Sequence, residues 1–344
     1  MLGAAEALYR VLLERRRRKW TRGTATTFAG CQVLSVGNLT TGGTGKTPAV
    51  QWLARRLQAD GAKVAVVARG YGGQLSAAGA VVSDGQQTFV NATQAGDEPL
   101  LHARSLPGVV VIIGRDRVAA VQRAIDDFGV DTVILDDGFQ FWSLQRDLDL
   151  VLLDARRPLG NGHLLPRGRL REPPESLMRA DAILLTRADV ATQAQRDAAR
   201  RLVARYTQAP VFEASHAPLA LRDERTATEQ PLTALHGARV FAVSALADNS
   251  AFAATLQKSG AQAQRHVARR DHHRWTKSEI KRVLTDAASS DAMVVTTEKD
   301  AVKWQPAWLH DEQAVTVWSL RIKLKMLPDD EAFCEWLRGA LKRV

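Results

Sequence analysis

The chain contains 344 residues, of which 45% are hydrophobic and 24% are charged, and its formal net charge is +10 at pH 7. This length predicts about two domains with a substantial core, and the composition is that of an ordinary soluble globular protein. The two cysteines, Cys31 and Cys334, are far apart and lack the spacing of a metal site. They argue against a disulfide scaffold and favour a reducing compartment.

The first 22 residues are a basic segment, MLGAAEALYRVLLERRRRKWTR, whose seven Lys and Arg and two Glu give it half of the net charge. Its charge follows the apolar part without a cleavage site, which argues against a signal peptide. The apolar part is also shorter than the roughly 20 residues that span a bilayer. We expect residues 1–22 to form an amphipathic helix. One face would carry Leu2, Ala5, Leu8, Tyr9, Leu12 and Leu13, and the opposite face Glu6, Arg10 and Glu14.

This basic segment has three candidate roles. An apolar face with a basic end suits the surface of an anionic membrane leaflet, which is the role that we favour. The segment also fits a terminal helix docked on the protein's own core, or an arm that binds nucleic acid. A cluster of Arg residues alone does not discriminate between these roles.

A glycine-rich turn lies between a predicted strand at residues 33–36 and a predicted helix that follows Pro48. Glycines in such a turn let backbone N–H groups face an anion, and the helix N-terminus adds a partial positive charge. Lys46 is expected to reach the β- and γ-phosphates, and Thr47 to bind Mg²⁺. Thr40 stands where the strict P-loop pattern has glycine, so the match is imperfect. The predicted nucleotide-binding residues are Thr41, Gly42, Gly43, Thr44, Gly45, Lys46 and Thr47.

Continuous apolar runs alternate with helical stretches over the rest of the chain, which is typical of a parallel sheet covered on both faces. We therefore predict an α/β fold with a P-loop NTPase-type, doubly wound, mostly parallel sheet and a second, smaller α/β domain. Ligands are expected beyond the carboxyl ends of the strands. The polar stretch 221–232 is expected to link the two domains. The predicted parts are the helix 1–22, a P-loop domain 23–230, a smaller domain 231–315, and a return segment with a closing helix 316–344.

Two carboxylates end the predicted buried strand TVILDDGFQ. An acid at the tip of a strand beside a P-loop is where a Mg²⁺-binding Walker B residue belongs. Buried strands seldom end in paired like charges without a cation. We therefore expect Asp136 and Asp137 to complete a magnesium site with Thr47.

Two further acidic clusters have roles that the residues alone leave open. Asp97 and Glu98 precede Pro99, so they fit helix capping as well as a catalytic base. The motif RDHHRW places Asp271 and His272 together, and it fits an acid–base pair or a surface loop. Zinc would need further ligands, and neither cysteine is near.

Two other segments carry weaker signals. The stretch TRAD at 186–189 faintly resembles the guanine-reading N-K-x-D of GTPases. The loop at 154–175 is crowded with Gly, Pro and Arg, and it fits either an anionic-substrate loop or a solvated surface segment.

Considered together, the motifs resemble those of the tetraacyldisaccharide 4′-kinase family. They are VGNLTTGGTGKTP, ARGYGG, GDEP, GRDR, DDGFQ, GNGHLLPRGRLRE, RDHHRW and TTEKDAVK, in the family's order over nearly the whole chain. The resemblance implies transfer of the ATP γ-phosphate to the 4′-hydroxyl of a tetraacylated diglucosamine 1-phosphate. It further implies Mg²⁺ and the cytoplasmic face of a bacterial inner membrane.

The resemblance also implies site residues. Asp97 would be the base for the sugar hydroxyl and His272 its supporting partner, with Lys46 as a further catalytic residue. Arg167 and Arg169 depart from the pattern, since a smaller residue and a proline are expected there. The implied metal residues are Thr47, Asp136, Asp137 and Glu98, and the implied substrate-binding residues are Arg69, Tyr71, Arg117, Gln140, Asn161 and Arg171.

The implied partners are an acylated disaccharide phosphate lipid and an anionic membrane surface, with no nucleic acid and no protein partner. Two other classes remain as alternatives. A P-loop GTPase or metallochaperone would prefer GTP, and the chain lacks a convincing base-reading motif for it. A membrane- or RNA-associated module switched by nucleotide would show little acceptor-dependent turnover.

Overall fold

The computed structural model of the chain describes residues 2–21, 30–309 and 315–342. Its strands are β1 (Gln32–Asn38), β2 (Val64–Ala68), β3 (Ala80–Ser83), β4 (Val110–Ile113), β5 (Thr132–Asp136), β6 (Leu148–Asp154), β7 (Ala182–Thr186), β8 (Val211–Asp223), β9 (Glu229–Gln230), β10 (Arg239–Ser244), β11 (Gln262–Ala268), β12 (Met293–Thr297) and β13 (Val317–Leu327). Its α-helices are α1 (Leu2–Thr21), α2 (Lys46–Ala59), α3 (Ala92–Ala95), α4 (Asp97–Ser105), α5 (Arg117–Phe128), α6 (Gln193–Val203), α7 (Asn249–Lys258), α8 (Lys277–Ser289), α9 (Glu298–Ala301), α10 (Pro306–Leu309) and α11 (Glu331–Leu341). Short 3₁₀ helices occur at Gln74–Ser76, Pro174–Arg179 and Leu232–Leu235.

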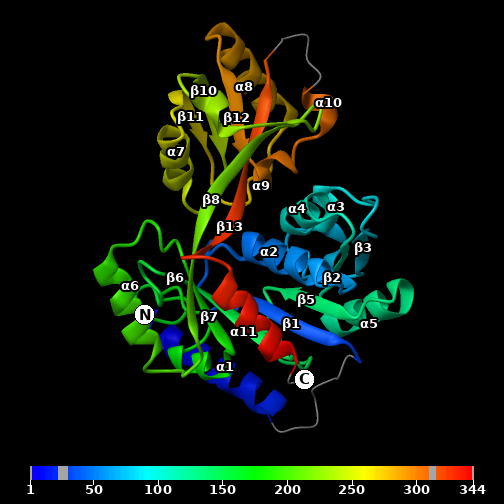
Figure 1. The fold of residues 1–344 in the computed structure, drawn as a ribbon, viewed down its shortest axis with the longest axis vertical. Helices are drawn as coiled ribbons and strands as arrows, with labels where there is room; N and C mark the ends of the chain where they lie inside the picture. The colour runs from blue at the N-terminus through cyan, green and yellow to red at the C-terminus, as the bar shows by residue number, and fades with distance from the viewer. Residues whose placement is uncertain (1, 22–29, 310–314, 343–344) are drawn as a thin grey trace.

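One sheet joins the described strands in the order β11-β10-β12-β13-β8-β7-β6-β1-β5-β2-β4-β3, and β9 pairs with β8 outside this path. The pairings from β7 to β4 are parallel, and only the edge strand β3 in that body is antiparallel to its neighbour. Figure 1 shows this part as a lower body and β10 to β12 as part of an upper body, with the long strands β8 and β13 between them. The prediction of a mostly parallel, doubly wound sheet is confirmed.

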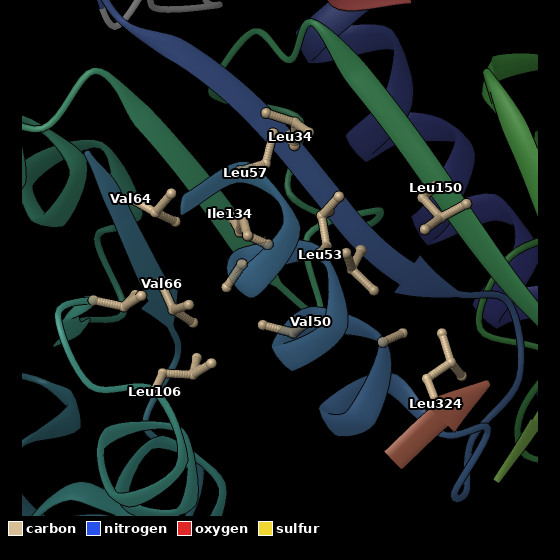
Figure 2. Packing of buried hydrophobic residues seen from close by; sticks show 14 of the residues in the cluster. Leu34, Val50, Leu53, Leu57, Val64, Val66, Leu106, Ile134, Leu150 and Leu324 are labelled. Atoms are coloured by element: carbon tan, nitrogen blue, oxygen red, sulfur yellow. The ribbon is translucent and has the colours of Figure 1, made fainter. Parts of the chain in front are cut away.

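The lower body buries both faces of its sheet, and β5 shows why its sequence is continuously apolar. The side chain of Ile134 joins the cluster that contains Val50 and Leu53 of α2, as Figure 2 shows. Its neighbours Val133 and Leu135 belong to the cluster on the α5 side. Because successive side chains of a strand point to opposite faces, a strand between two helical layers needs apolar residues at every position.

The two bodies are connected by an antiparallel strand pair. The register of β8 and β13 runs from Asp223 opposite Trp318 to Glu213 opposite Leu327. Within the stretch 221–232, which was expected to link the two domains, Leu221–Asp223 continue β8 and Glu229–Gln230 form β9. Polar residues are compatible with these strand positions because Arg222 and Asp223 are half-buried and Glu229 and Gln230 are exposed.

The C-terminal helix α11 returns to the lower body. Phe333 makes edge contacts with Trp52 of α2 and Phe212 of β8, with ring centroids 5.3 and 4.8 Å apart. The predicted boundary between residues 22 and 23 lies outside the described residues. The division into four parts stays a prediction.

The N-terminal helix forms as predicted, and the residues of its predicted apolar face are divided between the protein and the molecular surface. Tyr9 and Leu13 pack against the core, and Glu6 also faces the protein, where its carboxylate accepts a hydrogen bond of 2.9 Å from the backbone N–H of Leu164. Leu8 and Leu12, which were expected beside Tyr9, are 62% and 52% exposed. A buried backbone donor needs an acceptor, and Glu6 meets that need. Among the helices that the structure describes, none is long and apolar enough to cross a membrane.

Candidate active site

The glycine-rich turn follows β1, whose neighbours in the sheet are β5 and β6. Gly45 precedes α2 with φ +83°, in the left-handed region that favours glycine, and a Cβ there would overlap the ring of His216. The amide of Asn38 donates to the hydroxyl of Thr44 over 2.9 Å, and Lys46 Nζ donates to Asn38 Oδ1 over 3.3 Å. Asn38 therefore fixes both the turn and the lysine.

The turn is held from behind by the end of β7. The Thr186 hydroxyl donates to the carbonyl oxygen of Thr44 over 2.9 Å, and Arg187 donates to that of Gly43 over 2.8 Å. Arg187 is itself paired with Asp154 at 2.6 Å. The TRAD stretch, weighed above as a base-reading motif, thus uses its first two side chains to support the glycine-rich turn.

Asp136 and Asp137, at the carboxyl end of β5, have different surroundings. Asp136 is buried, with Oδ2 3.3 Å from Nε2 of His102 in α4, and its Oδ1 has no partner among the described residues. Asp137 pairs with Arg171 at 2.7 Å and lies 3.5 Å from Lys46. Burial raises the pKa of Asp137, but the charges of Lys46, Arg171 and Arg117 outweigh burial and hold that pKa well below its usual range.

The structure brings Asp97 and His272 together from segments that are 175 positions apart. Nδ1 of His272 lies 3.0 Å from Oδ2 of Asp97, the first residue of α4. Burial raises the pKa of Asp97, but the hydrogen bond with His272 and the charge of Lys299 lower it below the ordinary value. The same hydrogen bond raises the pKa of His272, against burial and Lys299. His272 has φ +59°, a conformation that costs a non-glycine residue about 1–2 kcal/mol.

Three of the predicted substrate-binding residues surround the Asn38 and Asp137 region. Arg171 donates to Asn38 Oδ1 and to both oxygens of Asp137, Arg117 donates to the Asp137 carbonyl oxygen, and Gln140 donates to that of Asn38. Arg117 and Arg171 therefore fix the charge and backbone of Asp137.

The other three predicted substrate-binding residues are distributed differently. The Tyr71 ring lies 5.6 Å from the His272 ring, centroid to centroid, and is 67% exposed. Arg69 is close enough to Arg117 to lower its pKa further, in addition to the effect of burial. The amide of Asn161 donates to the carbonyl oxygen of Arg167, in the loop that contacts α1, and no described contact joins it to the Asp97–His272 pair.

Comparison with known proteins identifies the family of this chain. The family model described as Tetraacyldisaccharide-1-P 4′-kinase matches residues 1–342. The chain belongs to this family. A curated relative from Anaeromyxobacter sp. (strain Fw109-5), named tetraacyldisaccharide 4′-kinase, is 43% identical over 340 residues, which are 98% of this chain and 91% of the relative. The relative of the same name from Anaeromyxobacter dehalogenans (strain 2CP-C) is 46% identical over 305 residues, 88% of this chain and 80% of its own.

A solved structure supports the same assignment. The crystal structure of LpxK from Aquifex aeolicus in complex with ATP is 29% identical to this chain, with a TM-score of 0.77. The match covers 98% of this chain and 97% of that one. The resemblance inferred from the motifs and the P-loop NTPase-type fold are thereby confirmed, and the chain is an ATP-dependent kinase with an alcohol group as acceptor.

The residues beside the turn fit a magnesium ion of the kind that kinases use. No group of three or more His, Cys, Asp or Glu side chains in the described part of the chain is arranged as a metal site. Mg²⁺ is usually bound through only one or two carboxylates, with water and substrate phosphates as the other ligands. The buried, unpartnered Oδ1 of Asp136 and the hydroxyl-bearing Thr47 provide such donors. Glu98 is one helical turn before His102 on the same face of α4, and it pairs with Lys299 at 3.2 Å.

Several residues of this site were not predicted from the sequence. His102, Arg187 and Lys299 contact Asp136, the turn and His272, respectively. The available signal was position: His102 lies near the GDEP motif, and Arg187 and Lys299 each follow a predicted strand. The partners themselves come from distant segments, so sequence spacing could not indicate the pairs.

Proposed function

We propose that this kinase transfers the γ-phosphate of ATP to the 4′-hydroxyl of a tetraacylated disaccharide 1-phosphate, a precursor of lipid A. The family assignment over nearly the whole chain supports this acceptor. The observation that carries the proposal is the hydrogen bond between Asp97 and His272. The histidine would orient the Asp97 carboxylate so that it can accept the proton of an acceptor hydroxyl.

The phosphates of ATP would bind to the glycine-rich turn and Lys46. Thr47, Asp136 and Asp137, with Glu98 from α4, would hold Mg²⁺, which would supply charge neutralisation at the β- and γ-phosphates. Arg171 and Arg117 keep Asp137 ionised and oriented. Together these residues would compensate the charge that develops during phosphoryl transfer.

Asp97 would accept the proton of the 4′-hydroxyl. At the same time the 4′-oxygen of the sugar would form a bond to the γ-phosphorus, and the bond between that phosphorus and the ADP oxygen would break. Phosphoryl transfer depends mainly on positioning and charge compensation, so a carboxylate with a lowered pKa is sufficient as proton acceptor. His272 would orient that carboxylate. Tyr71, next to His272, together with Arg69 and Asn161, would contact the acceptor.

The N-terminal helix would hold the enzyme at the cytoplasmic face of the bacterial inner membrane. Its exposed Leu8, Val11 and Leu12 and its run of basic residues favour an anionic lipid surface over nucleic acid as partner. An acceptor with four acyl chains stays in a bilayer, so contact between the enzyme and that surface would bring the two together.

Incubation of the full-length protein with labelled ATP and a lipid A disaccharide 1-phosphate in detergent tests this function. We expect label on the lipid, and none when the 4′-hydroxyl is replaced by hydrogen. A preference for GTP would favour a GTPase instead. Nucleotide binding without label on any lipid would favour a nucleotide-switched membrane-binding module.

A further inference from the structure

Lys299 lies beside the Asp97–His272 pair without being part of it. It belongs to the short helix α9 in the TTEKD stretch, and its side chain is 18% exposed. Its Nζ atom lies 3.2 Å from Glu98 Oε1, 3.3 Å from Asp271 Oδ1 and 3.4 Å from His272 Nε2. One ammonium group thus contacts Glu98 of α4 together with Asp271 and His272 of the RDHHRW loop.

The backbone that carries Lys299 is fixed on both sides. The fully buried Asp300 accepts hydrogen bonds from the N–H of Ala245, from the indole of Trp275 and from Lys303. On the other side, Glu298 accepts the N–H of Ile322 in β13 over 2.9 Å. A side chain presented from such a support has few alternative positions, which is the usual condition for a positioning group.

The chemistry of an ammonium group determines which way these hydrogen bonds run. A lysine Nζ has three N–H donors and no acceptor, and it has three neighbours here. His272 Nε2 must therefore accept, which places the ring proton on Nδ1, the atom 3.0 Å from Asp97. The other carboxylate near Nε2, Asp271 Oδ2, is 3.9 Å away and too distant to accept a proton from it.

We propose that Lys299 is a positioning residue for phosphoryl transfer, which holds the His272 ring in the neutral Nδ1–H tautomer so that Nδ1–H donates to Asp97. Asp97 then keeps the orientation in which its carboxylate faces the acceptor. The inference rests on the proposed function for the roles of Asp97 and His272. A ring with the proton on Nε2 would instead present a lone pair to a carboxylate, which is the wrong tautomer for this pair.

The direct test is the ¹⁵N NMR spectrum of the full-length protein labelled at histidine, with the His272 signals assigned through His272→Gln. At the pH of the kinase assay we expect a protonated Nδ1 and an unprotonated Nε2. In Lys299→Met we expect the proton to move to Nε2 or to exchange between the two nitrogens, and Lys299→Arg should retain the original pattern. A doubly protonated ring or an Nε2–H tautomer in the unmodified protein would overturn the inference, as would unchanged signals in Lys299→Met.

Kinetics separates positioning from a simple contact between the two bodies. Lys299→Met should lower kcat by roughly 10- to 100-fold, the scale for losing an orienting partner, with little change in the KM for ATP. Arg274→Gln removes another contact between the bodies, the hydrogen bond to the carbonyl oxygen of Gly72, and should leave kcat unchanged. Equal losses in both variants would contradict the inference. The NMR measurement does not depend on turnover. An active Asp97→Asn enzyme would refute the role of Asp97 as the base, and the spectra would still decide the tautomer of His272.

Discussion

Lys46 is expected to supply most of the positive charge that neutralises the bound phosphates. Its Nζ atom lies 3.3 Å from Asn38 Oδ1 and 3.5 Å from Asp137 Oδ1, and these contacts fix its position beside the turn. Lys46→Ala should lower acceptor-dependent turnover by about 10³-fold or more, because contacts of this kind act on the charge of the transition state. The measurement is the rate of γ-phosphate transfer to lipid.

The fold should survive this change, since Asp137 keeps its pair with Arg171. Lys63→Ala, at an exposed lysine outside the site, serves as the matched control and should transfer phosphate normally. Near-normal transfer by a folded Lys46→Ala protein would remove the lysine from the site.

Asp97 and His272 should act as one unit. Asp97→Asn is expected to lower kcat by about 10²–10⁴-fold, the usual scale for a general base, with little change in ATP binding. His272→Ala should cost less, and the double variant should be little worse than Asp97→Asn alone. A double-mutant cycle measures this directly, and losses that multiply independently would mean that His272 has another role.

At the scale of elements, the end of β6 supports the phosphate-binding turn through Asp154 and Arg187. Burial raises the pKa of Asp154, but its hydrogen bonds with Arg156 and Arg187 lower it to about 2, below the ordinary 3.8. A lowered carboxylate pKa adds stability above the ordinary value, and this stability is lost as pH falls toward the folded-state value.

Asp154→Asn should therefore lower the free energy of unfolding at neutral pH by on the order of 1–2 kcal/mol. The difference from the unmodified protein should shrink between pH 3.8 and about 2. Urea unfolding at a series of pH values measures it. Asp127→Asn, at an exposed ion pair with Arg123, is the control and should have little effect. A difference that stays constant with pH would refute the role of this carboxylate.

The exposed residues of α1 can be changed without disturbing the contacts of this helix with the protein, so membrane contact can be tested separately. Leu8→Ser combined with Leu12→Ser removes exposed apolar area while Glu6 and Tyr9 keep their hydrogen bonds to the lower body. Binding to anionic vesicles should weaken by roughly 10-fold or more, because a buried leucine contributes about 1.5–3 kcal/mol. ATP affinity should not change.

Vesicle sedimentation measures this binding. Phe89→Ser, at an exposed aromatic residue between β3 and α3, is the matched control. If the double variant sedimented with anionic vesicles as well as the unmodified protein, the membrane contact would lie elsewhere in the molecule.

In the molecule as a whole, structure that depends on local sequence patterns could be predicted, and pairings between distant segments could not. The sheet could be predicted because runs such as Val133–Leu135 must be apolar on both faces. The pairing of β8 with β13 could not be predicted, because the paired residues are about 100 positions apart in the sequence. The contact of Glu6 with the protein could not be predicted either, because helical periodicity does not reveal that its carboxylate accepts the backbone N–H of Leu164.

The site followed the same division. The glycine-rich turn, the acids after β5 and the GDEP motif are each contiguous in sequence, so the sequence alone suggests a chemical role for each of them. Arg187 contacts Gly43 across 144 residues, and Lys299 contacts Glu98 across 201 residues in addition to Asp271 and His272 of its own body, so sequence spacing indicates neither set of contacts. The positive φ of His272 and Asp137 is likewise set by the surrounding fold and has no sequence signal.

We expect the enzyme to attach the new phosphate to the 4′-oxygen of the disaccharide. The most direct measurement is a ¹H–³¹P correlation spectrum of the lipid product made by the full-length enzyme with ATP and the disaccharide 1-phosphate. We predict one new phosphomonoester signal correlated with H-4′, and an unchanged signal for the 1-phosphate. A diphosphate at position 1, a phosphate at another hydroxyl, or ATP hydrolysis with unmodified lipid would contradict the account.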